Sequence, residues 1–99
     1  MQREHRIRIT WSEAQTRIGL PSGARGIDPI WPAAAVPTRD EGWSLAYRFA
    51  RSPCEQGNPS EGWAHFLMED APEQWLTPGA ELRLFERGTG EYARVDVLD

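Results

Sequence analysis

Residues 62–98 read GWAHFLMEDAPEQWLTPGAELRLFERGTGEYARVDVL, and apolar and polar residues alternate along much of this stretch. Successive side chains of a β-strand point to opposite faces. Leu82 and Leu84 therefore share one face of a strand, and Ala93, Val95 and Val97 share the inward face of the next. The stretch predicts three antiparallel strands joined by two turns, a pattern typical of a small β-barrel or sandwich.

Turn residues separate these three strands. Pro78 and Gly79 precede the second strand. Residues 87–90, RGTG, predict a hairpin turn before the third, because glycine accepts the positive φ angles of tight reversals. Both faces of the first strand, residues 62–68, are largely apolar, which predicts a central position in the sheet. We expect a brief helical turn within residues 69–79.

Three further strands are expected upstream, at His5–Trp11, Ile27–Trp31 and Trp43–Phe49. The second of them contains Pro29, which lacks the N–H group of a central strand and so predicts an edge position or a bend. Long connections, residues 12–26 and 32–42, separate these strands. The sequence therefore predicts an all-β fold with one domain over residues 1–99, a single six-stranded antiparallel Greek-key β-barrel.

Composition narrows the class of protein. The chain has 99 residues and a single cysteine, so it forms no intramolecular disulfide and suits a reducing cytoplasm. The first residues, MQREHRIRITW, have no signal-peptide core, and no apolar run is long enough for a membrane span, so we expect a soluble, unprocessed, cytoplasmic protein. All eleven basic residues are arginine, which we associate with a high-GC bacterial genome.

The charge balance argues against nucleic acid as an autonomous ligand. The formal net charge is −4, and an acidic domain lacks the electrostatic attraction that supplies most non-specific nucleic-acid affinity. Arg6 and Arg8 share one face of the first strand, where they form either a ligand surface or, as we expect, a solvated outer face.

Two short motifs resemble a known barrel. Residues 26–31, GIDPIW, and residues 82–88, LRLFERG, resemble the Gly-Tyr-Arg-Pro-Gln-Phe motif and the closing hairpin of the C-terminal β-barrel domain of translation elongation factor Tu and its small stand-alone relatives. In that family the barrel is non-catalytic, packs against a GTP-binding domain and helps to hold the tRNA stem. Gly26 and Pro29 match the motif, whereas Asp28 and Ile30 replace its Arg and Gln, so the resemblance implies a barrel reused for binding other partners.

The long connections around the second strand carry the candidate binding site. A tryptophan rimmed by arginines has the usual composition of an interface hot spot. The candidate binding residues are Arg17, Arg25, Asp28, Trp31, Arg39 and Trp75. In the alternative reading, Trp31 plugs the barrel end, Trp75 packs over it, and the arginines only solubilise the chain. Trp11, Trp43 and Trp63 lie at alternating strand positions and are expected to fill the core.

The sequence predicts a non-enzymatic module that binds another protein, with no cofactor, no metal and an undetermined oligomeric state. One alternative is a carbohydrate-binding module, which requires Trp31 or Trp75 as an exposed flat platform. Another is a small enzyme in which His65 or His5 activates the thiol of Cys54, or in which a histidine lies beside a carboxylate. The histidines with Glu69 and Asp70 lack the paired short spacing of metal ligands.

Overall fold

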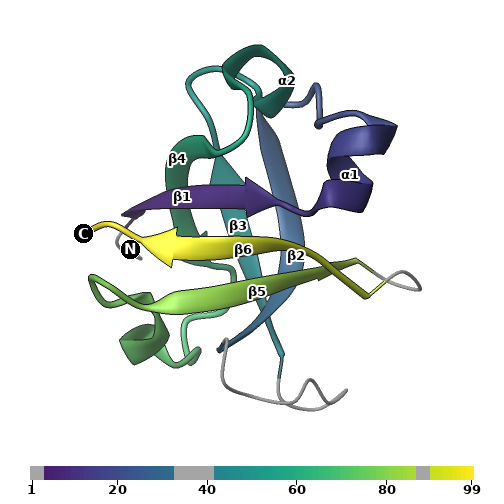
Figure 1. Ribbon diagram of the computed structural model, residues 1–99. Coiled ribbons are helices and arrows are strands. Elements are labelled where there is room, and N and C mark those ends of the chain that lie inside the picture. The colour runs from purple at the N-terminus through teal and green to yellow at the C-terminus, as the bar shows by residue number, and fades with distance from the viewer. Residues whose placement is uncertain (1–3, 33–41, 87–89) are drawn as a thin grey trace.

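The computed structural model describes residues 4–32, 42–86 and 90–99 (Figure 1). Arg39, one of the candidate binding residues, lies outside this part of the chain. The elements in chain order are β1 (His5–Trp11), α1 (Glu13–Ile18), β2 (Arg25–Pro32), β3 (Trp43–Arg48), α2 (Pro53–Gln56), β4 (Ser60–Phe66), the 3-10 helix η1 (Glu73–Leu76), β5 (Glu81–Glu86) and β6 (Gly90–Val97).

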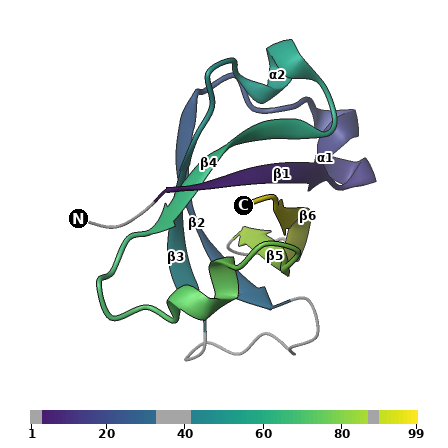
Figure 2. The same cartoon turned by 90° about the vertical axis from the view of Figure 1, so that its left-hand side faces the viewer.

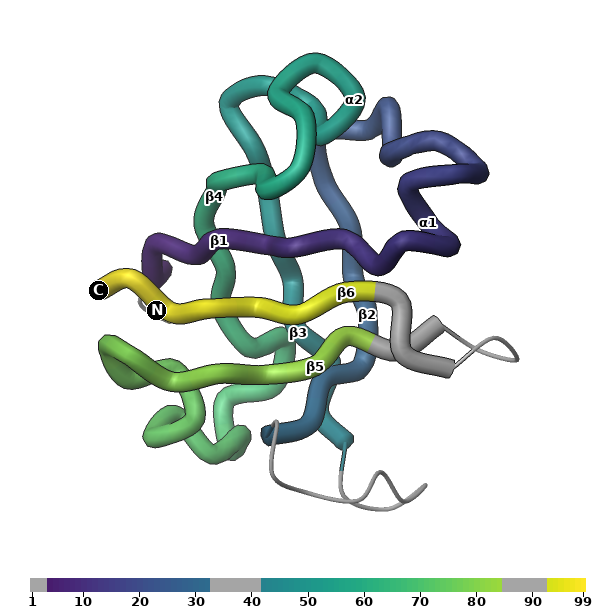
Figure 3. Tube along the Cα trace, viewed as in Figure 1, coloured from purple at the N-terminus to yellow at the C-terminus, as the bar shows by residue number. Residues whose placement is uncertain are grey.

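The described strands close into a barrel in the order β1-β4-β3-β2-β5-β6, and every pairing is antiparallel. This arrangement confirms the prediction of an all-β, six-stranded antiparallel barrel; the Greek-key part of that expectation stays a prediction. Figure 3 shows β1, β6 and β5 side by side on one side, with β2, β3 and β4 behind them. Among the described residues, no helix has the length and apolarity that a membrane crossing requires.

The pairing corrects one expectation about residues 62–98. β4 pairs with β1 and β3, while β5 pairs with β2 and β6, so the first two strands of that stretch are not neighbours. Within residues 62–98, only β5 and β6 are both consecutive and paired, and residues 87–89 of the turn predicted between them lie outside the described part of the chain. The link from β4 to β5 contains η1, which confirms the helical turn, and Leu76 of η1 is buried in the core.

Alternation along the strands builds the core. In β1 the residues at positions 5, 7, 9 and 11 are buried while the residues between them are exposed or half-buried. β6 follows the same rule, because Ala93, Val95 and Val97 are all at most 2% exposed. The core cluster is Ile7, Ile9, Trp11, Ile30, Leu45, Phe49, Ala64, Phe66, Leu76, Leu82, Leu84, Ala93, Val95 and Val97.

The tryptophans only partly follow the expected distribution. Trp11 is buried, and its indole N–H donates to the Ser60 hydroxyl, 3.0 Å away. Trp43 is half-buried against the core. Trp63 was expected in the core, but it lies on the outer face of β4, because Ala64 and its alternating neighbours take the inward positions. When both faces of a strand are largely apolar, the sequence alone does not define the inward face.

β2 changes partner along its length. Its first part pairs with β3, from Arg25 opposite Arg48 to Ile30 opposite Trp43, and its last three residues, 30–32, pair with β5. In Figure 1, β2 passes behind β5. Pro29 lies just before the change of partner, which confirms the predicted edge position or bend.

Candidate binding surface

The structure does not bring the predicted site residues together. Arg25 begins β2, whereas Trp31 lies six positions further along the same strand, about 20 Å away at the usual rise per strand residue. Arg17 lies on α1, where it forms an ion pair with Glu13 at 3.0 Å. Figure 2 shows α1 on the opposite side of the barrel from β2 and β3.

The other predicted contacts are turned inward or covered. The Asp28 carboxylate accepts a hydrogen bond from the Tyr47 hydroxyl. Trp31 is only 9% exposed, and its ring lies so close to Gly42 that a side chain at that position would overlap it. Trp75 packs edge-on against Phe66 with ring centroids 6.1 Å apart. Neither tryptophan therefore offers the flat platform that the carbohydrate alternative requires.

The strand register brings together a surface that differs from the predicted site. Ile27 of β2 lies opposite Ala46 of β3, which lies opposite His65 of β4, and Arg25, Arg48 and Trp63 form the neighbouring row. All of these residues occupy outward positions. We call this surface the β2–β4 face, defined as Glu4, Arg25, Ile27, Ala46, Arg48, Trp63, His65 and Leu67. A pocket of about 580 Å³ opens on it, lined by Glu4, Arg25, Gly26, Ile27, Ala46, Tyr47, Arg48 and His65.

Arg48 is held in place on this face by two neighbours. Its Nε and one terminal nitrogen donate to the two Glu4 carboxylate oxygens at 2.7 and 2.8 Å. Its guanidinium carbon lies 4.5 Å from the centroid of the Trp63 ring, within the range of a cation–π contact. The hydrogen bond from Arg48 lowers the pKa of Glu4, and the same bond raises the pKa of Arg48. This pair is therefore electrically neutral near pH 7.

Arg25 differs from Arg48 in having no hydrogen bond or ion pair with any residue that the structure describes. The two arginines face each other across β2 and β3, and like charges directly opposite in a sheet are unfavourable. Ile27, two positions along, is 58% exposed, and Leu67, just beyond β4, is 50% exposed. The face thus combines an unneutralised cation with exposed apolar side chains.

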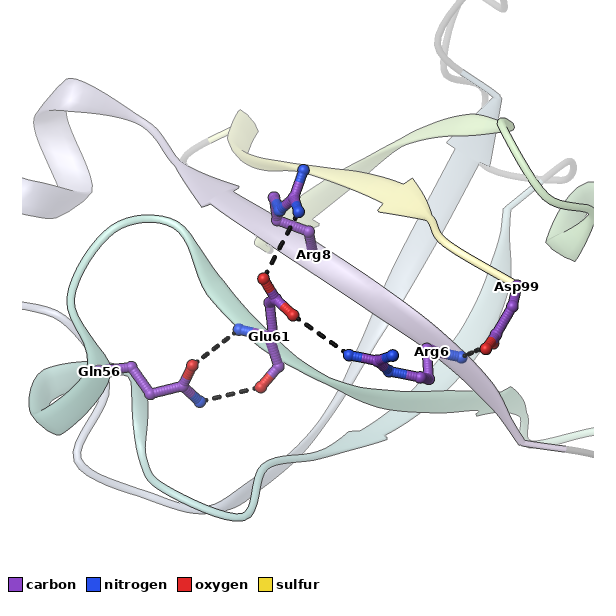
Figure 4. A network of polar contacts seen from close by, with 5 residues as sticks. All are labelled: Arg6, Arg8, Gln56, Glu61 and Asp99. Atoms are coloured by element: carbon purple, nitrogen blue, oxygen red, sulfur yellow. Dashed lines mark hydrogen bonds and ion pairs between the residues drawn. The ribbon is translucent and has the colours of Figure 1, made fainter.

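The arginines of β1 form a closed network instead (Figure 4). Arg6 and Arg8 each donate to one carboxylate oxygen of Glu61, at 3.4 and 3.5 Å. The Gln56 side chain bonds both the N–H and the C=O of Glu61, and the Arg6 N–H donates to Asp99. These contacts favour the solvated-face reading over a ligand surface on β1.

The arrangement also gives no support to thiol catalysis. The exposed Cys54 sulfur lies 3.4 Å from the Ser52 hydroxyl, and no histidine approaches it among the described residues. The second form of the enzyme alternative, a histidine beside a carboxylate, is met at His5, whose Nε2 lies 3.0 Å from the Glu73 carboxylate and whose Nδ1 lies 3.2 Å from the Asp99 carbonyl. A pocket of about 340 Å³ opens beside them, so that alternative stays a prediction. Within the described residues, no three His, Cys, Asp or Glu side chains gather as metal ligands would.

Sequence reasoning found Arg25 but missed most of the β2–β4 face. Glu4 precedes the first predicted strand and receives no position from the sequence, and Ala46 and Arg48 share a face of residues 43–49 with no sign of what that face meets. Alternation sets Ala46 and Arg48 on one face of residues 43–49 and Trp63 and His65 on one face of residues 62–68, but it placed Trp63 in the core and so did not show that the two faces adjoin outside the barrel. Only the strand order places these side chains beside Arg25.

Comparisons with known proteins found no family model, no curated protein and no solved structure that matches this chain. The resemblance to the barrel of elongation factor Tu therefore stays a prediction from the two motifs.

Proposed function

We propose that this chain is a non-enzymatic binding module and that the β2–β4 face docks another protein. The observation that carries the proposal is the exposure of Ile27 and Leu67 on a sheet face beside the unneutralised Arg25. Exposed apolar side chains rimmed by charge are typical of interfaces, where an apolar anchor is desolvated and charged groups orient the partner. The partner is expected to present apolar side chains next to a carboxylate.

The charges of the face suit this partner. Glu4 neutralises Arg48, so Arg25 leaves the β2–β4 face with a net charge of about +1 on a chain of net charge −4. A local positive site on an acidic protein attracts an acidic group and disfavours non-specific association. The lone cysteine, which is exposed, is consistent with the reducing cytoplasm that we propose as the location.

Substitution of Arg25 tests the proposal. Arg25→Glu should weaken partner binding at least about tenfold, because it turns the attraction for a carboxylate into repulsion. It should leave stability within about 0.5 kcal/mol, since exposed arginines contribute little to folding. Arg17→Glu changes the net charge equally on α1, away from the face, and serves as the matched control.

The measurement is paired capture from lysate of the source cell, followed by titration of each purified candidate against the three chains. A specific partner is retained by the wild type and by Arg17→Glu but lost from Arg25→Glu. A partner bound equally by all three chains would place the interface elsewhere. Recovery of a tightly bound small molecule with no protein partner would refute the proposal, since the pocket on the face is also of ligand size.

A further inference from the structure

One edge of the first half of β2 has no strand beside it among residues 4–32, 42–86 and 90–99. β3 pairs with residues 25–30 on one side, but β5 pairs only with residues 30–32 on the other. In the described parts of the chain, no strand pairs with residues 25–29 on the side away from β3. The register of β2 with β5 stops at the pair Ile30–Leu84, and the described part of β5 ends two residues later, at Glu86.

The ladder fixes which backbone groups line that edge. The Phe49 N–H donates to the Ala24 carbonyl at 2.8 Å, and hydrogen-bonded pairs in an antiparallel ladder recur at every second residue. Gly26 and Asp28 therefore bond to β3, whereas the N–H and C=O groups of Arg25 and Ile27 point away from it. The Pro29 carbonyl also points away from β3, but it faces the N–H of Phe85, because Ile30 and Leu84 form a non-hydrogen-bonded pair of the β2–β5 ladder. Pro29 has no N–H to leave unpaired.

An unpaired strand edge is a template for pairing with another chain. Among the described residues, two donors and two acceptors remain at this edge, the N–H and C=O groups of Arg25 and Ile27, and both side chains are exposed. Pro29 and the start of the pairing with β5 limit the length of an added strand to about five residues.

We propose that an extended segment of another protein adds to this edge as an antiparallel strand. This inference rests on the proposed function and specifies how the partner binds. On its outward face the segment would place an acidic side chain beside Arg25 and apolar side chains beside Ile27 and Pro29. Read from its N-terminus, such a segment has the pattern apolar-x-apolar-x-acidic, where x is any residue. Backbone hydrogen bonds supply affinity and the alternate side chains supply specificity.

Charge favours a different protein over a second copy of this chain. Two β2 edges paired antiparallel about Ile27 would set each Arg25 against Pro29 of the other copy, which offers no carboxylate. Each copy also carries a net charge of −4, which opposes association. A carboxylate on a partner segment would neutralise the charge of Arg25.

The test uses a fluorescent peptide, Ser-Val-Thr-Val-Thr-Glu-Ser, titrated against the whole chain by anisotropy. The second Val would lie opposite Ile27 and donate to its carbonyl. N-methylation of that Val should weaken binding at least about tenfold, because it removes the donor. N-methylation of the Thr before Glu is the matched control, since that N–H would point away from β2, and should change binding less than about twofold. The Arg25→Glu variant should no longer bind this peptide, but it should bind a peptide in which Arg replaces Glu.

Amide hydrogen exchange reports the edge directly. Peptide binding should slow the exchange of the Arg25 and Ile27 amides at least about tenfold, while the Gly26 and Asp28 amides, already bonded to β3, should change little. Absence of saturable binding up to about 1 mM peptide, or equal effects of the two N-methylations, would overturn strand addition. Protection of Arg25 and Ile27 that grows with protein concentration alone would overturn it in favour of a second copy. The proposed function is tested separately, by comparing how much of the protein partner Arg25→Glu and Arg17→Glu retain.

Discussion

At the scale of single residues, Gly62 shows how one side chain can be excluded by the path of the backbone. It is buried in β4, and a Cβ atom there would overlap the Arg48 carbonyl oxygen and lie 2.7 Å from the Phe49 ring. The carbonyl belongs to the neighbouring strand and cannot move aside without breaking the sheet. Gly62→Ala should therefore destabilise the barrel by about 2 kcal/mol or more, measured by urea unfolding. Gly23→Ala, where the added atom meets only the Arg25 carbonyl at 3.7 Å, should be close to neutral; equal stability of the two variants would contradict this account.

Glu4 and Arg48 give a second prediction at the same scale. The folded-state pKa of Glu4 lies below its ordinary value of 4.5, so the ion pair stabilises the fold above that pH and is lost as the pH falls through the lowered pKa. The effect on stability should be small, because the Glu4 and Arg48 side chains are 35% and 45% exposed. The NMR resonance of the Arg48 Nε–H should shift as the pH falls through the lowered pKa of Glu4 in the wild type and stay constant in Glu4→Gln. A midpoint at or above 4.5 would contradict the bond.

At the scale of elements, alternation was enough to predict most strands and their inward faces, because burial of one face imposes a period of two. It placed Ile7, Ile9 and Val95 in the core. It failed for Trp63, where both faces of the strand are apolar and only the neighbouring strands decide which is inward. It also failed for the order of strands, since pairing of β4 with β1 rather than β5 depends on contacts distant in sequence.

The candidate site was less predictable for the same reason. Arg25 could be named from its place in a long connection, but its separation from Trp31 follows from the extended path of β2. The neutralisation of Arg48 by Glu4 needs a register that brings residues 44 positions apart together. In the sequence, Pro29 alone indicates that one edge of β2 lacks a neighbouring strand, because proline is tolerated in a strand where no N–H has to be donated.

At the scale of the whole molecule, the distribution of charge separates protein binding from the tRNA contact that the resemblance to elongation factor Tu implies. Most of the described arginines already face a carboxylate. Those arginines are Arg6, Arg8, Arg17, Arg48, Arg51 and Arg94. An arginine held by a carboxylate neutralises a phosphate only after that pair is broken, and the net charge of −4 repels the nucleic acid as a whole.

Few phosphate contacts are thus available, and affinity for RNA depends on their number because each contact releases a counterion. A labelled RNA hairpin should therefore show no binding tighter than about 10⁻⁴ M at 150 mM salt, measured by anisotropy. Lowering the salt to about 50 mM should gain little, since the slope with salt scales with the number of phosphates neutralised. Arg25→Glu should leave this weak signal nearly unchanged, in contrast to its effect on the protein partner. Micromolar binding with a steep salt slope would instead mean that residues outside the described ranges supply a cationic surface, and it would restore the translation role that the charge of this barrel argues against.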